Sequence, residues 1–257
     1  EMCIRDSPYT DPKLLSFPYV NGSLFSDETI IVPQFTDDLR VELLLNASRR
    51  FDWKDISPTI FGAVFESTLN PETRRAGGMH YTSIENIHKV IDPLFLDDLK
   101  TELIKIEGEK VERKRRFALR EFQQKLASLN IFDPACGSGN FLTESYIQLR
   151  RLENRILESI QGEGQSSIGF DGDADPIKVS IQQFYGIEIN DFAVSVAKTA
   201  LWIAESQMLT ETQDIVQRYI DYFPLTTNAA IVEGNALRMD WNCLLYTSPS
   251  PRDMRRS

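Results

Sequence analysis

The sequence predicts an α/β fold, with a parallel sheet of three strands preceded by a mostly helical region. One observation is the segment 131–141, where two apolar residues lead through Asp-Pro into a Gly-Ser-Gly turn and a helix beginning at Asn140. This pattern is typical of a buried strand that runs into a glycine-rich turn. A second observation is that two more apolar strands follow, separated by a helix, and such alternation indicates parallel pairing. A third is that apolar residues before position 130 recur at helical spacing.

The first part of the chain is expected to contain a helix from Asp37. Another should start at Ser57-Pro58, where serine suits the N-cap and proline the first helical residue. Each helix should bury one apolar side. The residues expected there are Leu39, Leu43 and Leu44 in the first helix, and Ile60, Phe61, Val64 and Phe65 in the second.

A third helix is expected to begin at Thr82, which has capping-box spacing to Glu85. Asp92-Pro93 should then restart the chain into a long helical stretch that carries two apolar stripes. The stripes consist of Leu99, Leu103 and Ile106, and then of Phe117, Phe122, Leu126 and Leu129.

The second half alternates strands with helices. Strands are expected near 130–134, over 184–189 and over 229–232, with helices at about 140–160 and 191–208. A polar loop, 161–176, precedes the second strand. The buried face of the 140–160 helix should consist of Leu142, Tyr146, Leu149, Ile156 and Ile160.

The ends of the first two strands carry candidate ligand-binding residues. Gly137 and Gly139 have no Cβ, so backbone N–H groups of their turn can approach a ligand closely. Glu188 ends the second strand, where a carboxylate can accept hydrogen bonds from both ribose hydroxyls of a nucleoside, with Ile189 beside the adenine ring. Taken alone, Glu188 is better explained as an acidic residue favoured at a helix N-terminus.

Three other features have two interpretations each. The amide of Asn235, after the third strand, could hydrogen-bond an adenine edge, although asparagine there is more often a turn residue. Thr82 is either a ligand contact or the capping-box residue. The basic run 113–116 could touch DNA, but acidic residues are interleaved with it, which favours a solvated helix face.

Composition argues against a chain that binds nucleic acid by itself, a disulfide-rich protein, a membrane-spanning protein and a Cys/His metal site. The net charge of −10 makes the chain a poor nucleic-acid binder by itself, because binding phosphates requires Lys and Arg. Cys136 is the only cysteine outside the chain ends, so no disulfide framework is expected, which fits a cytoplasmic protein. No apolar run reaches membrane-spanning length, and no Cys/His cluster has the spacing of metal ligands.

The string DPACGSGNF, residues 133–141, resembles motif I of the N6-adenine DNA methyltransferases. GMHYTS before it resembles motif X, and FYGIEIN and GNALRMDW after it resemble motifs II and III. This order is that of the gamma-class amino methyltransferases, and the wider sequence resembles the MmeI-type family of restriction–modification enzymes. The resemblance implies a partial Rossmann-like class I methyltransferase sheet, its first three strands, and S-adenosyl-L-methionine as cofactor.

The resemblance also implies residue roles. The 133–139 turn would hold the methionine part of the cofactor. Thr82, in the segment that resembles motif X, would close over that part. The glutamate that ends the second strand would hold the ribose, with Ile189 and Asn235 at the adenine, although many relatives have aspartate at the position of Asn235. The implied cofactor-binding residues are Thr82, Asp133, Ala135, Gly137, Gly139, Glu188, Ile189 and Asn235.

The implied reaction is methyl transfer to adenine N6 in double-stranded DNA, with the base flipped out of the duplex. The family's catalytic Asn/Asp-Pro-Pro-aromatic tetrapeptide does not occur in the sequence, so no catalytic residue is named and this chain alone is expected to be inactive. Two alternatives stay open. One is methylation of a protein or RNA amide or amine with the same cofactor, and the other is a cofactor-binding module without activity.

Two domains are expected, a partial helical spacer over 8–55 and the N-terminal half of a methyltransferase domain over 56–242. Residues 1–7 and 243–257 are expected to be adapter-like artefacts. MCIRDS at 2–7 and CLLYT at 243–247 can be encoded by inverted copies of one DNA word, as translated sequencing adapters would be. On this interpretation the chain is an internal fragment of a longer protein.

Overall fold

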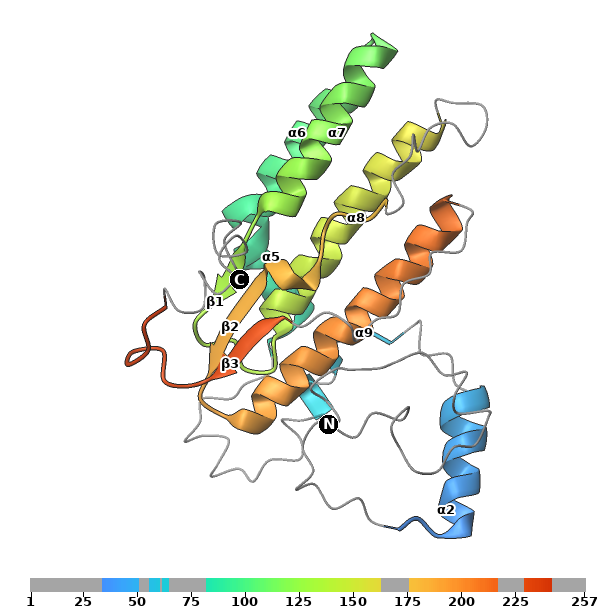
Figure 1. Cartoon of the computed structure of the whole chain (residues 1–257), viewed down its shortest axis with the longest axis vertical. Helices are drawn as coiled ribbons and strands as arrows, with labels where there is room; N and C mark the ends of the chain where they lie inside the picture. The colour runs from blue at the N-terminus through green and yellow to red at the C-terminus, as the bar shows by residue number, and fades with distance from the viewer. Residues whose placement is uncertain are drawn as a thin grey trace, which may run out of the picture.

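The computed structural model describes residues 34–50, 56–60, 62–64, 82–162, 176–216 and 229–241 (Figure 1). At its centre is a parallel three-stranded sheet in the order β1-β2-β3. The strands are β1 (Ile131–Asp133), β2 (Phe184–Glu188) and β3 (Ala230–Glu233). Their carboxyl ends therefore meet at one edge, and the predicted α/β fold with a partial Rossmann-like sheet is confirmed.

Two long helices connect the strands and lie side by side (Figure 1). α8 (Asn140–Gly162) follows β1 and begins at the predicted residue, and its predicted face is buried. α9 (Asp191–Val216) follows β2 and continues past the predicted end at 208. It continues because residues up to Val216 still pack inward, including Leu209 and Thr212.

One face of the sheet packs on α8. The rings of Phe184 in β2 and Tyr146 in α8 meet edge to face, with centroids 5.6 Å apart. A Cβ on Gly186 would lie 2.8 Å from Cys136 Sγ, so this strand position has room only for glycine. On the other face, Phe132 of β1 contacts Trp241 at a centroid distance of 5.1 Å.

The helical region expected to break at Asp92-Pro93 is continuous over residues 84–107. α5 (Ile84–Ile91) passes through a π-helical turn, η5 (Asp92–Leu96), directly into α6 (Asp97–Glu107). The expected restart at Asp92-Pro93 is therefore wrong. The Asp92 N–H still bonds to His88 O, and the wider π turn accommodates the proline without a break.

α6 is followed by α7 (Glu112–Ser128), and the two lie side by side (Figure 1). The predicted stripe of α6 is buried at Leu99 and Leu103. In α7 the buried stripe consists of Leu119, Phe122 and Leu126, whereas Phe117 is 67% exposed. The prediction for Phe117 is wrong because five residues separate it from Phe122, which places it on a different side of the helix.

The helix start at Thr82 is also one residue off. Ser83 is the N-cap of α5, and its Oγ accepts a hydrogen bond from the Asn86 N–H at 3.4 Å. Thr82 lies just outside the helix, so it has no capping role.

The first predicted helix has no buried residue in the described structure, and the second buries other residues than expected. In α2 (Asp37–Glu42) and the following π-helical segment η3 (Leu43–Arg50), the three predicted leucines are 43–58% exposed. No described residue covers them. In the segment 56–64, Ile60 and Val64 are exposed, while the buried side carries Thr59 and Gly62. Phe61 and Phe65 lie outside the described residues.

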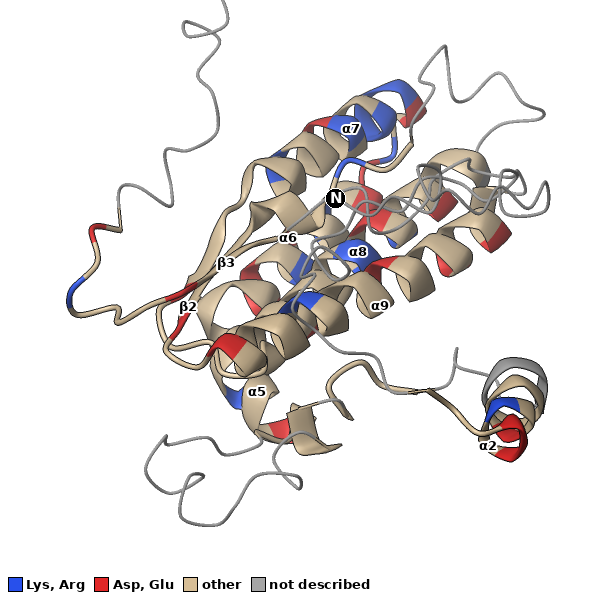
Figure 2. Cartoon of the chain, turned by 60° about the horizontal axis from the view of Figure 1, so that its bottom comes forward, with Lys and Arg blue, Asp and Glu red and all other residues tan. Residues whose placement is uncertain are grey.

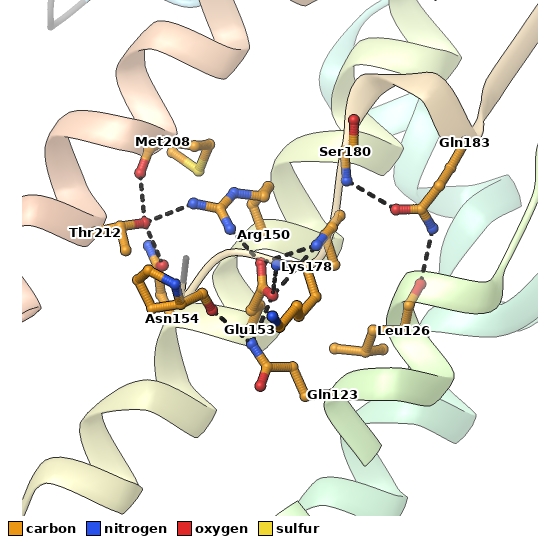
Figure 3. Close-up of polar contacts among 12 residues, drawn as sticks. Gln123, Leu126, Arg150, Glu153, Asn154, Lys178, Ser180, Gln183, Met208 and Thr212 are labelled. Atoms are coloured by element: carbon orange, nitrogen blue, oxygen red, sulfur yellow. Dashed lines mark hydrogen bonds and ion pairs between the residues drawn. The ribbon is translucent and has the colours of Figure 1, made fainter. Parts of the chain in front are cut away.

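A buried polar cluster fixes the chain where it returns to the sheet before β2 (Figure 3). Glu153 of α8 is completely buried and is paired with Arg150. Its carboxylate also accepts hydrogen bonds from Gln123 Nε2 at 2.8 Å and from the backbone N–H of Lys178 at 2.6 Å. The ionised pair is therefore compensated by several donors, as a buried charge requires.

The same return segment is fixed to α7 by Gln183. This residue belongs to a 3₁₀ turn, η6 (Ile181–Gln183), just before β2. Its Nε2 donates to Leu126 O at 2.9 Å and Leu129 O at 2.7 Å, and its Oε1 accepts from the Ser180 N–H at 2.8 Å. These bonds determine where β2 enters the sheet beside β1.

Within the part of the chain that the structure describes, no helix is both long and apolar enough to cross a membrane.

Candidate cofactor site at the carboxyl ends of the strands

The turn from Pro134 to Gly139 joins β1 to α8 at the carboxyl edge of the sheet. It contains two glycines with left-handed backbone, Gly137 at φ 56° and Gly139 at φ 78°. The Gly139 N–H donates to Cys136 O at 2.8 Å, and Gly139 O accepts the Thr143 N–H of α8 at 2.8 Å. Positive φ values favour glycine at both positions.

The two glycines face different surroundings. A Cβ on Gly139 would lie 2.7 Å from Ala197 Cβ, so this glycine lets the turn pack against α9. A Cβ on Gly137 would meet nothing within 4 Å, so this side of the turn is open. Both glycines were expected to let a ligand approach. The surroundings of Gly137 support this expectation, whereas those of Gly139 do not.

Glu188, at the end of β2, contacts this turn directly. Its side chain is 8% exposed, and its Oε2 accepts the Gly137 N–H at 2.9 Å. Its Oε1 accepts the Asn190 N–H at 3.0 Å. Glu188 therefore joins the turn to the end of β2, although 51 residues separate it from Gly137.

The first turn of α9 is capped by a different residue. Asn190 Oδ1 accepts the Ala193 N–H at 2.9 Å, which is N-cap geometry. A charge favoured by the helix dipole therefore does not by itself account for Glu188, because Glu188 also accepts a hydrogen bond from Gly137. Sequence reasoning missed Asn190, although asparagine directly before an apolar helix is an N-cap signal.

A second carboxylate lies beside Glu188. Asp133 Oδ1 accepts the Ala135 N–H at 3.0 Å. Burial raises the pKa of Asp133, and the negative charge of Glu188 raises it further, while the bond from Ala135 acts in the opposite direction. Burial, together with these two charges, also raises the pKa of the Cys136 thiol, which keeps it neutral.

The two predicted adenine contacts lie at the same edge. The Gly234 N–H donates to Glu188 O at 2.9 Å, which holds the segment after β3 against the end of β2. Ile189 is 62% exposed. Asn235 forms a turn, since its Oδ1 accepts the Leu237 N–H at 3.0 Å and its backbone O accepts the Arg238 N–H at 2.8 Å.

The structure thus gathers seven of the eight predicted cofactor-binding residues around one edge of the sheet. The remaining one, Thr82, is half-buried before α5, and no hydrogen bond joins it to the turn among the described residues. The rest of the motif X segment, 78–81, lies outside them. In the same described part of the chain, no group of His, Cys, Asp and Glu could hold a metal ion.

Comparisons with known proteins identify the family of this chain. DNA methyltransferase A of Bacillus subtilis is 38% identical over 229 residues, which cover 89% of this chain and 24% of the relative. The solved structure of the Type IIL restriction-modification enzyme MmeI in complex with DNA has a TM-score of 0.77 and 40% identity. That match covers 92% of this chain and 30% of the other.

The chain spans about a quarter of the length of that curated relative. A family model described as "MmeI, DNA-methyltransferase domain" matches residues 107–254, which is more than half of the chain. The chain therefore belongs to the MmeI DNA-methyltransferase family.

Proposed function

We propose that this chain is the cofactor-binding part of a site-specific DNA methyltransferase of a restriction–modification system. The proposed cofactor is S-adenosyl-L-methionine, and the proposed acceptor is the N6 amino group of adenine in double-stranded DNA. When bound, the cofactor supplies a methyl group on a sulfonium centre. Transfer of that methyl to the amine nitrogen would leave the sulfur as a neutral thioether and the amine with one proton to lose.

The observation that carries the proposal is the arrangement of Glu188 against the Gly137 turn. An ionised carboxylate has about four acceptor positions, two on each oxygen. Each Glu188 oxygen receives one backbone N–H, from Gly137 or from Asn190. One acceptor position thus remains on each oxygen, which suits the two neighbouring hydroxyls of a ribose.

The surroundings of this carboxylate fit the rest of the cofactor. The open side of Gly137 leaves room for the methionine part beside the turn. Ile189 offers an exposed apolar surface for the adenine ring, and the amide of Asn235 lies after the neighbouring strand. Asp133, Ala135 and Gly139 shape the turn, and Thr82 is proposed to contact the methionine end.

No residue of this chain is proposed as catalytic, because the sequence lacks the Asn/Asp-Pro-Pro-aromatic tetrapeptide. We therefore propose that the chain alone binds the cofactor without transferring its methyl group. A methyltransferase acting on protein or RNA is less well supported, since the relatives named above are DNA methyltransferases.

We also propose that the methyltransferase domain covers 56–242, after a helical spacer over 8–55. The contact of Ile56 O with Gln207 Nε2 of α9, at 2.7 Å, supports placing the boundary before residue 56. The apolar side chains of α2, in contrast, are exposed in the described structure.

The proposal is tested by calorimetric titration of S-adenosyl-L-methionine into the chain and its Glu188→Ala variant. Loss of one hydrogen bond to a charged group costs about 1.5–3 kcal/mol, so losing both ribose bonds should lower the affinity roughly a hundred-fold or more. Glu233→Ala is the matched control, because Glu233 pairs with Glu188 in register but is exposed. Unchanged affinity in Glu188→Ala would limit Glu188 to a structural role, and no binding by the unmodified chain would overturn the proposal.

A further inference from the structure

Gly62, in the segment of which residues 56–60 and 62–64 are described, lies against the glycine-rich turn, although about 75 residues of chain separate them. The beginning of this segment is fixed to α9, since Gln207 Nε2 donates to Ile56 O at 2.7 Å. Inside the segment, Ser57 Oγ and Thr59 Oγ1 form a hydrogen bond of 2.7 Å, and Thr59 is fully buried.

Gly62 is the point of closest approach. A Cβ built on it would lie 2.4 Å from Ser138 Oγ, 2.8 Å from Asn140 Oδ1 and 3.0 Å from Asn140 Nδ2. Real Cβ contacts are essentially never shorter than 3.0 Å, so any larger residue at position 62 must displace one of these side chains. Ser138 belongs to the turn, and Asn140 is the first residue of α8.

Of the two obstacles, Ser138 is half-buried, whereas Asn140 is enclosed. The side chain of Asn140 is 6% exposed, and its Oδ1 has no hydrogen-bond partner among the described residues. Thr143, one turn further along α8, is fully buried, and its Oγ1 likewise has no described partner. The start of α8 is therefore enclosed, and a close-packed site transmits a displacement to its neighbours.

We propose that Gly62 is a positioning residue for the cofactor turn. Because it has no side chain, the segment 56–64 can cover Ser138 and Asn140 and hold the turn in the conformation in which the Gly137 N–H meets Glu188. The proposal rests on the function proposed above. It adds a residue outside the motif-like segments that acts on cofactor binding through Ser138.

The test is the affinity for S-adenosyl-L-methionine, measured by calorimetry on the full chain in four forms. These are the unmodified chain, Gly62→Ala, Ser138→Ala and the double variant. Overpacking of this size should weaken binding about ten-fold in Gly62→Ala. Because Ser138 Oγ is the nearest obstacle, adding Gly62→Ala to Ser138→Ala should weaken binding by clearly less than ten-fold.

Gly108→Ala is the matched control. Gly108 caps the end of α6, and a Cβ there would lie 3.4 Å from Lys105 O, at the border of ordinary contact. Its affinity for the cofactor should equal that of the unmodified chain. If Gly62→Ala does not fold, the double variant, which keeps only the overlap with Asn140 Oδ1, is compared with Ser138→Ala alone and should bind less tightly than it by clearly less than ten-fold.

The possible results separate the two proposals. Unchanged affinity in Gly62→Ala, or an equal loss in both serine and alanine backgrounds, would overturn the positioning role while leaving the proposed function intact. Absence of binding by the unmodified chain would overturn the proposed function and the role of Gly62 with it.

Discussion

At the scale of single residues, the turn shows how two glycines in one short motif meet different physical demands. Both have positive φ, but only Gly139 packs against a neighbouring helix, where Ala197 lies. Gly137 instead leaves one side of the turn open and donates its N–H to Glu188. Substitution at the two positions should therefore have unequal consequences.

We expect Gly139→Ala to lower the free energy of unfolding more than Gly137→Ala. Both variants lose a left-handed glycine, which costs about 1–2 kcal/mol. Only Gly139→Ala adds an overlap with Ala197, worth roughly a further 1–3 kcal/mol. Urea unfolding followed by circular dichroism measures both values, and equal losses would contradict the packing role of Gly139.

Whether a residue of the site could be predicted depends on how far apart in the sequence its contacts lie. The glycine turn could be predicted because strand, turn and following helix are neighbours in the sequence, whereas the ribose role of Glu188 was favoured only by the resemblance of its segment to motif II. Gly62 and Ala197 could not, since each matters only through a contact with a distant part of the chain. The cap formed by Asn190 could also have been predicted, because its bonds to Ala193 and Glu188 both lie within three residues.

At the scale of elements, predictions held where an apolar stripe faced the core and failed elsewhere. The face of α8 was predicted correctly because the helix lies between the sheet and the other helices. The exposed leucines of α2 and η3 follow the same periodicity, yet no described residue packs on them. Periodicity shows which residues share a side of a helix, but tertiary contacts decide whether that side is buried.

One histidine joins α5 to α8 by polar contacts, beside the apolar packing of Ile87 and Ile91. His88 Nδ1 lies 2.8 Å from Asp92 Oδ1, and His88 Nε2 lies 3.1 Å from Glu144 Oε1. Gln148 Nε2 also donates to Glu144 at 2.7 Å, and Lys100 Nζ lies 3.9 Å from Asp92. The hydrogen bond to Asp92 raises the pKa of His88 most, with Glu144 adding to it and burial opposing it.

This raised pKa predicts a pH dependence of stability. Protonated His88 is favoured in the folded chain, so its contribution is complete below the unfolded pKa of about 6.5 and is lost as pH rises through the higher folded pKa. We expect the stability difference between the unmodified chain and His88→Gln to shrink from pH 5.5 to pH 8. The change should stay below about 1 kcal/mol, since the ring is partly exposed. Urea unfolding at each pH measures it, and a constant difference would contradict a charged His88.

At the scale of the whole molecule, charge is distributed unevenly. Figure 2 shows Lys and Arg on α7 at the end away from the strands, where the run 113–116 lies. Arg113 and Lys114 are exposed, as predicted for a solvated face, whereas Arg115 is half-buried and donates to Glu109 O at 2.6 Å. The rise of an α-helix places this run roughly 20 Å along the axis from the other end of α7, which leads into β1.

The carboxyl edge of the sheet has the opposite charge. Its acidic residues are Asp133, Glu188, Asp191 and Glu233. With a net charge of −10 for the chain, this edge repels phosphate, and the basic end of α7 is too far away to compensate for it. A DNA duplex that approaches the proposed cofactor site would therefore need cations from outside the described residues.

We therefore expect this chain to bind a labelled DNA duplex weakly, with a dissociation constant above roughly 10⁻⁴ M at physiological salt, the weak limit of non-specific binding. Fluorescence anisotropy measures this directly, with and without S-adenosyl-L-methionine. The variant Arg113→Gln/Lys114→Gln is the matched comparison, because it removes the exposed charges of α7 and should leave the weak binding almost unchanged. Saturable binding at micromolar concentration that this variant abolishes would instead make the end of α7 a DNA contact, and the acidic edge would then be only the cofactor side of a larger interface.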